Sequence, residues 1–498
     1  MDTDPESDPE ITSIHNSSGD VKPGGLFIAI KGFKSDGHDH IGDALERGAV
    51  AVVAEKKITG EVRSVEVADT RKAMASIAAR FYSNPSHGIC LIGITGTNGK
   101  TTTAFILETI LVEAGFKTGV IGTLNYRYCG KTFHNPVTTP ESIDLQEILS
   151  RMQKAKVTHV IMEVSSHAID LQRVRNCAFD TGVFTNLTQD HLDYHRTMGS
   201  YFACKKRFFT RILTTGPKAS KAVSVINIDN ERGRELEKAL LTGVITTGKS
   251  DGADISAAGI EERISGISGT LKIKGKGYSF SSNLVGSFNL ENILSAAGAA
   301  ESLGVDPFTI VRGIGECKGV PGRLERVEPA FGRHVFVDYA HTPDALESIL
   351  RTLKTQAPKR IISIVGCGGD RDRSKRPIMG RIAATMSDLA IITSDNPRSE
   401  DPAKIISDLL QGIESSLYHE YDKKNLEPGF TVNGFYVEPD RKKALEMAVK
   451  VSRPGDIIVA AGKGHETYQI LNNGTIDFDD RKILGLALEH CGSMEKAS

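Results

Sequence analysis

The stretch "GITGTNGKTTT", residues 93–103, decides how the surrounding chain folds. An apolar run, "CLIGIT" (90–95), precedes it, and "TTTAFILETILVEAG" (101–115), which has helical periodicity, follows it. A glycine-rich turn between a strand and a helix N-terminus presents backbone N–H groups and partial positive charge to phosphate oxygens. The usual phosphate-binding pattern has Gly where this chain has Ile94, so the loop is two residues short. It is a damaged nucleotide site, a chance glycine cluster or a different kind of loop.

The loop retains the side chains that a nucleotide site needs. Lys100 can reach the β- and γ-phosphates, and the Thr101 hydroxyl can ligate Mg²⁺. A structural turn alone requires neither residue. We therefore predict an ATP site whose loop residues are Gly96, Thr97, Asn98, Gly99, Lys100, Thr101 and Thr102.

Beyond the loop, short β-branched runs alternate with longer Ala- and Leu-rich segments. This order predicts parallel sheets covered by helices, an α/β fold. Strands are expected at 49–53, 90–95, 158–164, 179–187, 221–229, 360–366, 388–395 and 456–462, and helices at 101–114, 291–303, 343–354 and 376–386. The Gly- and Ser-rich stretch 250–284 is more typical of antiparallel hairpins.

The length of 498 residues is too great for one hydrophobic core. The turn-forming stretches "FYSNPSHG" (81–88) and "ECKGVPGRLE" (316–325) indicate two boundaries. The predicted domains are 1–86, 87–322 and 323–498.

Composition excludes several classes of protein. The 61 Lys and Arg residues balance 62 Asp and Glu residues, so neither nucleic acid nor an anionic membrane is expected as a partner. No apolar run approaches the ~20 residues of a membrane span. The start, "MDTDPESDPE" (1–10), is acidic and unlike a signal peptide, and the seven Cys are widely spaced without a Cys-x-x-Cys pair. We expect a cytoplasmic protein with reduced thiols and no zinc site.

Three further side chains are candidates for a metal site. Glu163 follows an apolar run and could bind Mg²⁺, although Glu at a strand end is often simply exposed. His191 is a second candidate ligand, with a hydrogen-bonded structural role as the alternative. Lys205 follows in a helical stretch, where its positive charge is unexpected beside a metal ion.

Seven motifs, in order along residues 11–485, together resemble the Mur ligase family of peptidoglycan synthesis. They are "GTNGKTT" (96–102), "MEVSSHA" (162–168), "TNLTQDHLDYH" (185–195) with Lys205, "GSFNLENILSAAGA" (286–299), "GVPGRLE" (319–325), "VDYAHTPDALE" (337–347) and "AGKGHE" (461–466). The resemblance implies three α/β domains: a uridine-binding N-terminal domain, a central P-loop ATPase-like domain with a parallel sheet, and a Rossmann-like C-terminal domain. It also implies that the short loop is the family's own phosphate loop.

The resemblance assigns residues to ligands. Beside the phosphate loop, the ATP set includes Asn289, Asn292, Arg323 and Asp338. Thr101, Glu163, His191 and a carbamylated Lys205 would hold Mg²⁺, and Lys100, Lys205 and His191 would be the catalytic residues. The UDP-muramoyl-dipeptide would contact Ser18, Thr138, Thr139, Ser165 and Arg173. The family usually reads Asp-Ser-Arg near Ser18, whereas this chain reads "NSSGD" (16–20).

The motif "SDNPRSE" (394–400) resembles the family's signature for meso-diaminopimelate. Arg398 can bind a carboxylate bidentately, and diaminopimelate has a carboxylate that lysine lacks. The alternative is an Asn-Pro turn with a solvent-facing Arg. The amino-acid-binding set implied by the resemblance is Arg371, Asp395, Asn396, Pro397, Arg398, Gly462 and Glu466.

These features together predict a cytoplasmic, monomeric, ATP-dependent amide ligase of cell-wall synthesis, on which cell shape and division depend. It would add meso-diaminopimelate to UDP-N-acetylmuramoyl-L-alanyl-D-glutamate through an acyl phosphate, with Mg²⁺ as cofactor. Alternatives are the same reaction with L-lysine, a neighbouring enzyme such as folylpolyglutamate synthetase or the D-Ala-D-Ala adding ligase, and a nucleotide-dependent binding module without turnover.

Overall fold

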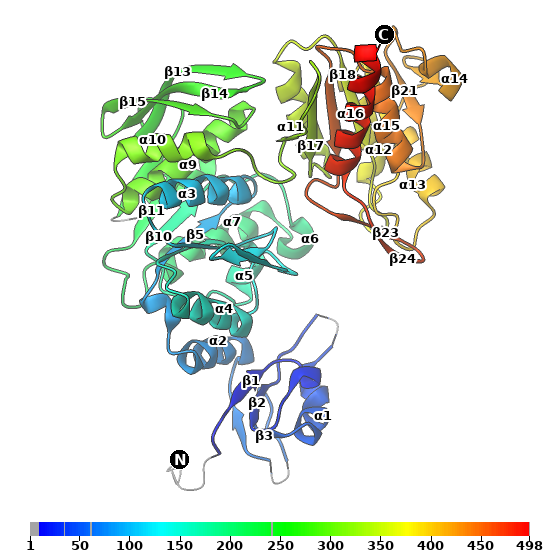
Figure 1. Cartoon of the computed structure of the whole chain (residues 1–498). Coiled ribbons are helices and arrows are strands. Elements are labelled where there is room, and N and C mark those ends of the chain that lie inside the picture. Colours follow the sequence, from blue (N-terminus) through cyan, green and yellow to red (C-terminus); the bar gives the residue numbers. More distant parts are fainter. Residues whose placement is uncertain (1–8, 34, 60–61, 241–242, 498) are drawn as a thin grey trace. The chain divides into compact units, whose positions relative to one another are not determined.

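The structure is a computed structural model that describes residues 9–33, 35–59, 62–240 and 243–497 (Figure 1). Most of the acidic N-terminal stretch discussed above, residues 1–8, lies outside the described residues. The chain folds as two compact units. The first comprises residues 1–258, 271–278 and 291–314, and the second comprises 259–270, 279–290 and 315–498.

The N-terminal residues form a small parallel sheet. Its strands are β1 (Ser13–His15), β2 (Gly25–Ile28), β3 (Ala49–Ala54) and β4 (Ser64–Glu66), in that order. Two helices accompany it, α1 (Ile41–Glu46) and α2 (Thr70–Phe81). The Asp69 side chain caps α2 by accepting a hydrogen bond from the backbone N–H of Lys72 at 3.0 Å.

The central sheet has a parallel middle and an antiparallel end at β7 and β8. Its order is β15-β14-β13-β12-β11-β10-β5-β9-β6-β7-β8. The parallel strands are β5 (Cys90–Thr95), β6 (Thr118–Ile121), β9 (His159–Glu163), β10 (Thr181–Phe184), β11 (Val223–Asn227) and β12 (Val244–Thr247). Short β7 (Tyr126–Tyr128) and β8 (Lys131–Phe133) pair antiparallel at one end. The sheet is therefore mixed, with the predicted parallel order in the strands that flank the phosphate loop.

The stretch predicted as hairpins forms three consecutive strands joined by two-residue connections, which suit antiparallel neighbours. They are β13 (Ile255–Arg263), β14 (Gly266–Ile273) and β15 (Lys276–Ser282). The helices of this part of the chain are α3 (Lys100–Glu113), α4 (Ser142–Lys154), α5 (Ser166–Asp170), α6 (Leu192–His195), α7 (Met198–Arg207), α8 (Glu231–Lys238), α9 (Ser287–Ser302) and α10 (Pro307–Glu316).

The C-terminal sheet has the order β16-β17-β22-β18-β19-β21-β20. Its strands are β16 (Glu325–Arg326), β17 (His334–Asp338), β18 (Ile361–Val365), β19 (Leu389–Ile392), β20 (His419–Tyr421), β21 (Gly434–Val437) and β22 (Ile457–Ala461). All neighbours are parallel except β16 and β17. The helices are α11 (Pro343–Lys354), α12 (Lys375–Met386), α13 (Pro402–Leu410), α14 (Lys423–Leu426), α15 (Arg441–Val451) and α16 (Asp480–Ala497).

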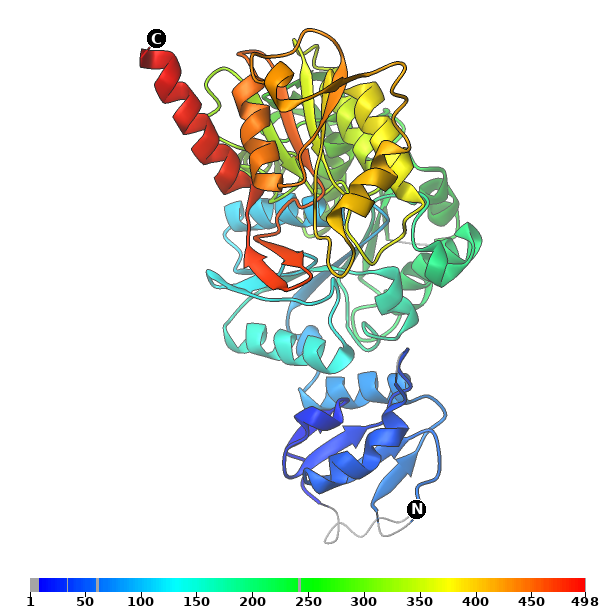
Figure 2. The same ribbon diagram turned by 90° about the vertical axis from the view of Figure 1, so that its right-hand side faces the viewer.

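Two hydrophobic cores cover the two faces of this C-terminal sheet. Side chains of α11, α12 and α13 pack on one face, and those of α15 and α16 pack on the other. Between β22 and α16 the chain forms the hairpin β23 (Tyr468–Leu471) and β24 (Gly474–Asp477), seen near the sheet end opposite to the free end of α16 in Figures 1 and 2. The predicted α/β class is confirmed, while the two predicted boundaries between the three domains stay predictions.

The parallel strands place the candidate residues. In open α/β sheets, ligands bind beyond the carboxyl ends of the strands. The phosphate loop follows β5, Glu163 ends β9 and His191 follows β10. In the second unit, Asp395 follows β19 and Gly462 follows β22.

Candidate nucleotide and substrate sites

The phosphate loop packs too closely for side chains at two of its glycines. Gly99 has φ +84°, and a Cβ there would lie 2.1 Å from Asn292 Oδ1. At Gly96, with φ +151°, a Cβ would lie 1.9 Å from Thr185 Oγ1. Both positions therefore require glycine.

Two lysines meet at the start of the loop. Lys100 Nζ donates hydrogen bonds to the Gly96 carbonyl at 3.0 Å and the Thr97 carbonyl at 2.8 Å. Lys205 Nζ, on α7, donates to the same Gly96 carbonyl at 2.8 Å. Burial, and then the neighbouring Lys100, hold the pKa of Lys205 well below its ordinary value. A buried lysine with a lowered pKa is a nucleophilic amine.

Glu163 is buried beside the loop and is surrounded by donors. Its Oε2 accepts from Thr101 Oγ1 at 3.0 Å and Thr123 Oγ1 at 2.9 Å, while Oε1 accepts from the Thr123 backbone N–H at 3.1 Å. A carboxylate beside a hydroxyl at a helix start is the hard-oxygen donor set that Mg²⁺ prefers. Among the described residues, no group of three or more His, Cys, Asp or Glu side chains could hold a metal ion. The fit to Mg²⁺ therefore rests on the Thr101 hydroxyl and Glu163.

His191 lies within an aromatic cluster next to Lys205. Its ring centroid is 6.0 Å from that of Tyr201, and Lys205 Nζ is 4.7 Å from the same Tyr201 ring. The Tyr201 hydroxyl is 3.2 Å from Thr97 Oγ1 in the phosphate loop. Partial burial lowers the pKa of His191, the Asp190 carboxylate opposes this, and the neighbouring Lys100 lowers the pKa further. The neutral imidazole that results is the form that binds metals. Tyr201 was missed from the sequence, where an aromatic residue at a helix start resembles an ordinary core residue.

Four of the five residues predicted to contact the UDP-substrate lie together. Thr139 Oγ1 donates to the Glu163 carbonyl at 2.8 Å and accepts from the Ser165 backbone N–H at 3.1 Å. Arg173 Nη1 donates to the Thr139 carbonyl at 3.0 Å. Thr138 Oγ1 lies 3.1 Å from Thr123 Oγ1, so the cluster adjoins the Glu163 donors.

Ser18, the fifth residue of that prediction, lies in the short turn η1 (Ser18–Asp20) of the N-terminal residues. Within the part of the chain that the structure describes, no hydrogen bond joins it to the other four. Its role stays a prediction.

The remaining ATP candidates are distributed over both units. Asn289 and Asn292 are three residues apart on α9 and therefore share a face of that helix. In the second unit, Asp338 is buried and accepts from the Leu324 N–H at 2.6 Å and the Ala340 N–H at 2.7 Å. Arg323 lies with its guanidinium carbon 5.2 Å from the Tyr339 ring centroid. Asp338 thus fixes the backbone that carries Arg323.

The predicted amino-acid site contains a buried polar network. Asn396 Nδ2 donates to Glu466 Oε2 at 2.8 Å. Lys463 Nζ, with a fully buried side chain, donates to Asn396 Oδ1 at 3.1 Å and Glu466 Oε2 at 3.0 Å. Lys463 was missed, although it stands in the "AGKGHE" motif, because its sequence position gives no sign of its burial.

Arg398 is held beside this network. Its backbone N–H donates to the Ile470 carbonyl at 3.1 Å, and its Nη1 donates to the Gly369 carbonyl at 2.8 Å. A Cβ at Gly462 would lie 2.3 Å from Asp395 Oδ2, so glycine is needed for these loops to approach. Arg371 is exposed and forms no ion pair among the described residues. The alternative of a solvent-facing Arg therefore suits Arg371 better than Arg398, whose guanidinium is anchored.

A fully buried ion pair supports the loop that follows β19 and the loop that follows β22. Arg441 Nη2 donates to Asp480 Oδ2 at 2.6 Å and to the Ala461 carbonyl at 3.0 Å, and Arg441 Nη1 donates to the Ser394 carbonyl at 3.5 Å. Ala461 and Ser394 directly precede Gly462 and Asp395. Sequence gave no signal for this pair, because its members are 39 residues apart in the chain.

A phosphate loop on a parallel sheet, with a buried lysine, a carboxylate and a second α/β unit, defines a class of nucleotide-dependent ligases. Three family models cover most of the chain: the Mur ligase family catalytic domain at residues 10–82, the Mur ligase middle domain at 94–300, and the Mur ligase glutamate ligase domain at 322–464. The chain belongs to the Mur ligase family.

The names of similar proteins agree with this family assignment. The UDP-N-acetylmuramoyl-L-alanyl-D-glutamate–2,6-diaminopimelate ligase of Geobacter metallireducens is 46% identical over 97% of this chain and 95% of its own length. The ligase of the same name from Bacillus cereus is 43% identical over 96% and 94%. A solved structure of a ligase with this name has a TM-score of 0.70 and 31% identity, covering 96% of this chain and 95% of that chain. The resemblance inferred from the motifs is confirmed.

Proposed function

We propose that this chain is an ATP-dependent ligase that adds meso-2,6-diaminopimelate to UDP-N-acetylmuramoyl-L-alanyl-D-glutamate in the cytoplasmic synthesis of peptidoglycan precursors. The observation that carries the proposal is the anchored Arg398 beside the Asn396–Lys463–Glu466 network. It presents a fixed guanidinium for a carboxylate next to a polar network for a charged amino acid. The names of relatives 43–46% identical over nearly the whole chain support it.

The first half of the reaction belongs to the phosphate loop. ATP phosphates would lie on the backbone N–H groups of Gly96–Thr102, with the Lys100 ammonium offsetting charge as the γ-phosphoryl group transfers. The acceptor is the γ-carboxylate of the D-Glu residue, and the products are an acyl phosphate and ADP. Thr138, Thr139, Ser165 and Arg173 would hold the dipeptide beside Glu163, where the structure clusters them.

Mg²⁺ is part of the proposal. Thr101 and Glu163 would hold one ion, and His191 with a carbamylated Lys205 would hold a second. Bound there, the ions would neutralise the charge of the transferring phosphoryl group. The carbamate forms when the neutral amine of Lys205 attacks carbon dioxide and releases a proton. The burial that lowers the pKa of Lys205 favours this neutral amine.

In the second half-reaction, the amine of diaminopimelate attacks the acyl carbon and phosphate leaves. Arg398 would bind the carboxylate that lysine lacks, and Glu466 with Asn396 would bind an amino group. The Lys463 ammonium beside Glu466 fixes the orientation of that carboxylate.

The test is phosphate release from ATP with UDP-muramoyl-dipeptide and one amino-acid substrate at a time: meso-diaminopimelate, L-lysine or D-Ala-D-Ala. We expect stimulation by meso-diaminopimelate. Stimulation by L-lysine alone would overturn the substrate assignment. If no substrate stimulated release while ATP still bound, the chain would be a nucleotide-dependent binding module.

The residue test is Arg398→Ala, with Arg381→Ala as control because Arg381 is an exposed arginine on α12. A hydrogen bond to a charged group is worth about 1.5–3 kcal/mol, so kcat/KM for diaminopimelate should fall by about 10- to 150-fold. The control should retain the activity of the unsubstituted protein. An Arg398→Ala enzyme with unchanged kcat/KM would remove the observation on which the proposal rests.

A further inference from the structure

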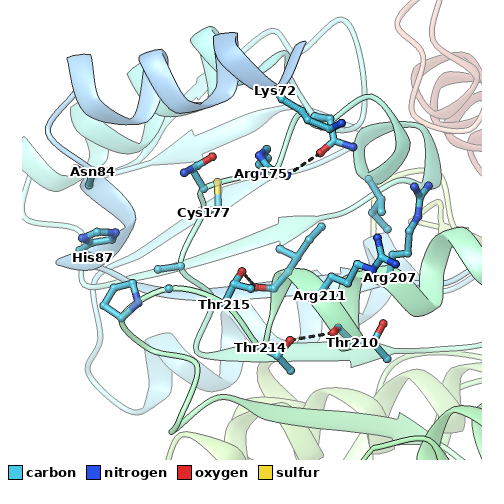
Figure 3. A pocket seen from close by; sticks show the side chains of 17 residues that line it. Lys72, Asn84, His87, Arg175, Cys177, Arg207, Thr210, Arg211, Thr214 and Thr215 are labelled. Carbon is cyan, nitrogen blue, oxygen red and sulfur yellow. Dashed lines mark hydrogen bonds between the residues drawn. The ribbon is translucent and has the colours of Figure 1, made fainter. Parts of the chain in front are cut away.

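A cavity of about 850 Å³ lies in the first unit. Four segments line it and leave it open to solvent: α2, residues 84–87, the turn that follows α5, and the end of α7 with the π-helix η4 (Phe208–Ile212) and the loop 213–217 (Figure 3). None of the residues predicted to contact ATP, metal, UDP-substrate or amino acid lines it.

The lining of this cavity is strongly basic. It includes Lys72, Arg175, Arg207 and Arg211, and none of its described lining residues is Asp or Glu. Figure 3 shows the four cations on three segments: Arg207 and Arg211 lie next to each other on the segment of α7 and η4, Lys72 lies on α2, and Arg175 lies in the turn after α5. The electrostatic potential inside is therefore positive from more than one side.

Two of the four cations are neutralised and two are not. Lys72 pairs with Asp69 at 2.9 Å, and Arg207 pairs with Asp170. Arg175 forms no ion pair with any residue that the structure describes, and its Nη1 donates only a long hydrogen bond, at 3.5 Å, to Gln172 Oε1. Arg211 likewise forms no ion pair within the described ranges. Arg175 and Arg211 are exposed and have no carboxylate partner among the described residues, so an anion bound between them would be stabilised.

The remaining lining residues suit an organic anion. The hydroxyl groups of Thr210, Thr214 and Thr215 on the η4 side donate to backbone carbonyls of their own segment, and the buried Cys177 and Ala178 contribute an apolar floor. A volume of about 850 Å³ is within the range of small-molecule sites. Arginine forks match phosphate oxygens bidentately, which favours phosphate over a single carboxylate.

We propose that this cavity binds a small organic phosphate carrying at least two negative charges. Arg175 and Arg211 bind the phosphate groups, whereas Lys72 and Arg207 remain paired with Asp69 and Asp170. The apolar floor accommodates the carbon skeleton. This site is separate from the phosphate loop and does not depend on the proposed reaction.

The test is binding of fructose 1,6-bisphosphate, as the probe, to the full chain by isothermal titration calorimetry. The Lys100→Ala variant is used as the background, because the phosphate loop could otherwise bind the same probe. We expect one remaining site in this background, and at least a tenfold loss of affinity when Arg175→Gln and Arg211→Gln are added. The control adds Arg263→Gln and Arg312→Gln, which remove two charges from exposed arginines elsewhere, and should retain the affinity.

Three results would overturn the proposal. They are no binding in the Lys100→Ala background, undiminished binding after the Arg175 and Arg211 substitutions, and an equal loss in the control. Inorganic phosphate, titrated in parallel, distinguishes an organic phosphate site from a general anion site, because it lacks the carbon skeleton and should bind at least tenfold more weakly. Equal affinity for the two probes would refute the assignment to an organic phosphate.

Discussion

Replacement of Asp480 by Leu should destabilise the second unit by leaving Arg441 charged and unpaired in the core. Both side chains of this pair are fully buried, with 0% exposure for each. Asp480 accepts from Arg441 Nε at 2.9 Å and Nη2 at 2.6 Å. Removing one partner of a buried pair costs about 3–5 kcal/mol, since the remaining charge keeps its desolvation penalty without compensation. For a unit of this size, each kcal/mol lowers Tm by about 2–4 °C, so Tm should fall by about 6–20 °C.

The double variant Arg441→Met with Asp480→Leu separates the cost of the unpaired charge from the loss of packing. Without a buried charge, it should recover at least half of the lost free energy of unfolding. It should still bind diaminopimelate more weakly, because Arg441 also donates to the carbonyls of Ala461 and Ser394 and so supports both amino-acid loops.

Differential scanning calorimetry gives the Tm of each variant, and phosphate-release kinetics give KM for diaminopimelate. Glu446→Leu is the control. Glu446 forms an exposed ion pair with Lys442 on α15, the helix that carries Arg441, and this pair should be worth less than about 1 kcal/mol. If the double variant were as unstable as Asp480→Leu, the cost would come from packing and the electrostatic reasoning would be refuted.

Three other predictions concern the phosphate loop, the carboxylate beside it and the pH response. Gly99→Ala should lower kcat/KM for ATP on the order of 100-fold, the effect on rate of a displacement near 1 Å, whereas Gly115→Ala, equally at positive φ but with no atom within 4 Å of its Cβ, should retain kcat/KM for ATP in the phosphate-release assay. Glu163→Gln should lower kcat by about 100-fold or more and raise the Mg²⁺ concentration needed for half-maximal phosphate release; an unchanged requirement would exclude Glu163 as a ligand. Burial lowers the pKa of His465 to about 4, below the value near 6.5 of an unfolded histidine. The unfolded chain thus binds this proton first, so stability is lost as pH falls from 6.5 towards 4, by at most about 2 kcal/mol at pH 5. Between pH 7 and pH 5, the free energy of unfolding of the His465→Gln variant, measured by urea unfolding, should fall by about 2 kcal/mol less than that of the unsubstituted protein. An identical fall in both proteins would contradict the assignment.

Much of the fold was predictable because its strands are buried on both faces. Such strands are continuous apolar runs, and "CLIGIT" became β5 with the predicted bounds of 90–95. The helix predicted at 343–354 also has those bounds, since Pro343 at its first position follows the capping Thr342. Strand ends were predicted less well. The run 179–187 gave only β10 at 181–184, because polar residues from Thr185 onwards leave the sheet to contact the phosphate loop.

The candidate residues were predictable where a motif carries them and not where tertiary packing creates the contact. Glu163 and Thr101 are 62 residues apart but come together because β9 lies next to β5 in the sheet. No local pattern could indicate that Lys463 is fully buried or that Arg441 pairs with Asp480. Such contacts depend on how helices cover the sheet, and that is decided by the whole core.

The short phosphate loop is held in place by hydrogen bonds from a neighbouring segment. The segment after β10 binds it along its length: the Thr97 N–H donates to the Asn186 carbonyl at 2.9 Å, the Asn98 N–H donates to Asn186 Oδ1 at 2.9 Å, and Thr185 Oγ1 donates to the Asn98 carbonyl at 2.7 Å. The loop is thus fixed by hydrogen bonds from outside itself. Because the same segment leads directly to His191, the loop and the predicted metal ligand are held by one piece of chain. A substitution in 185–188 should therefore impair nucleotide binding and metal dependence together, although none of these four residues was predicted to contact either ligand.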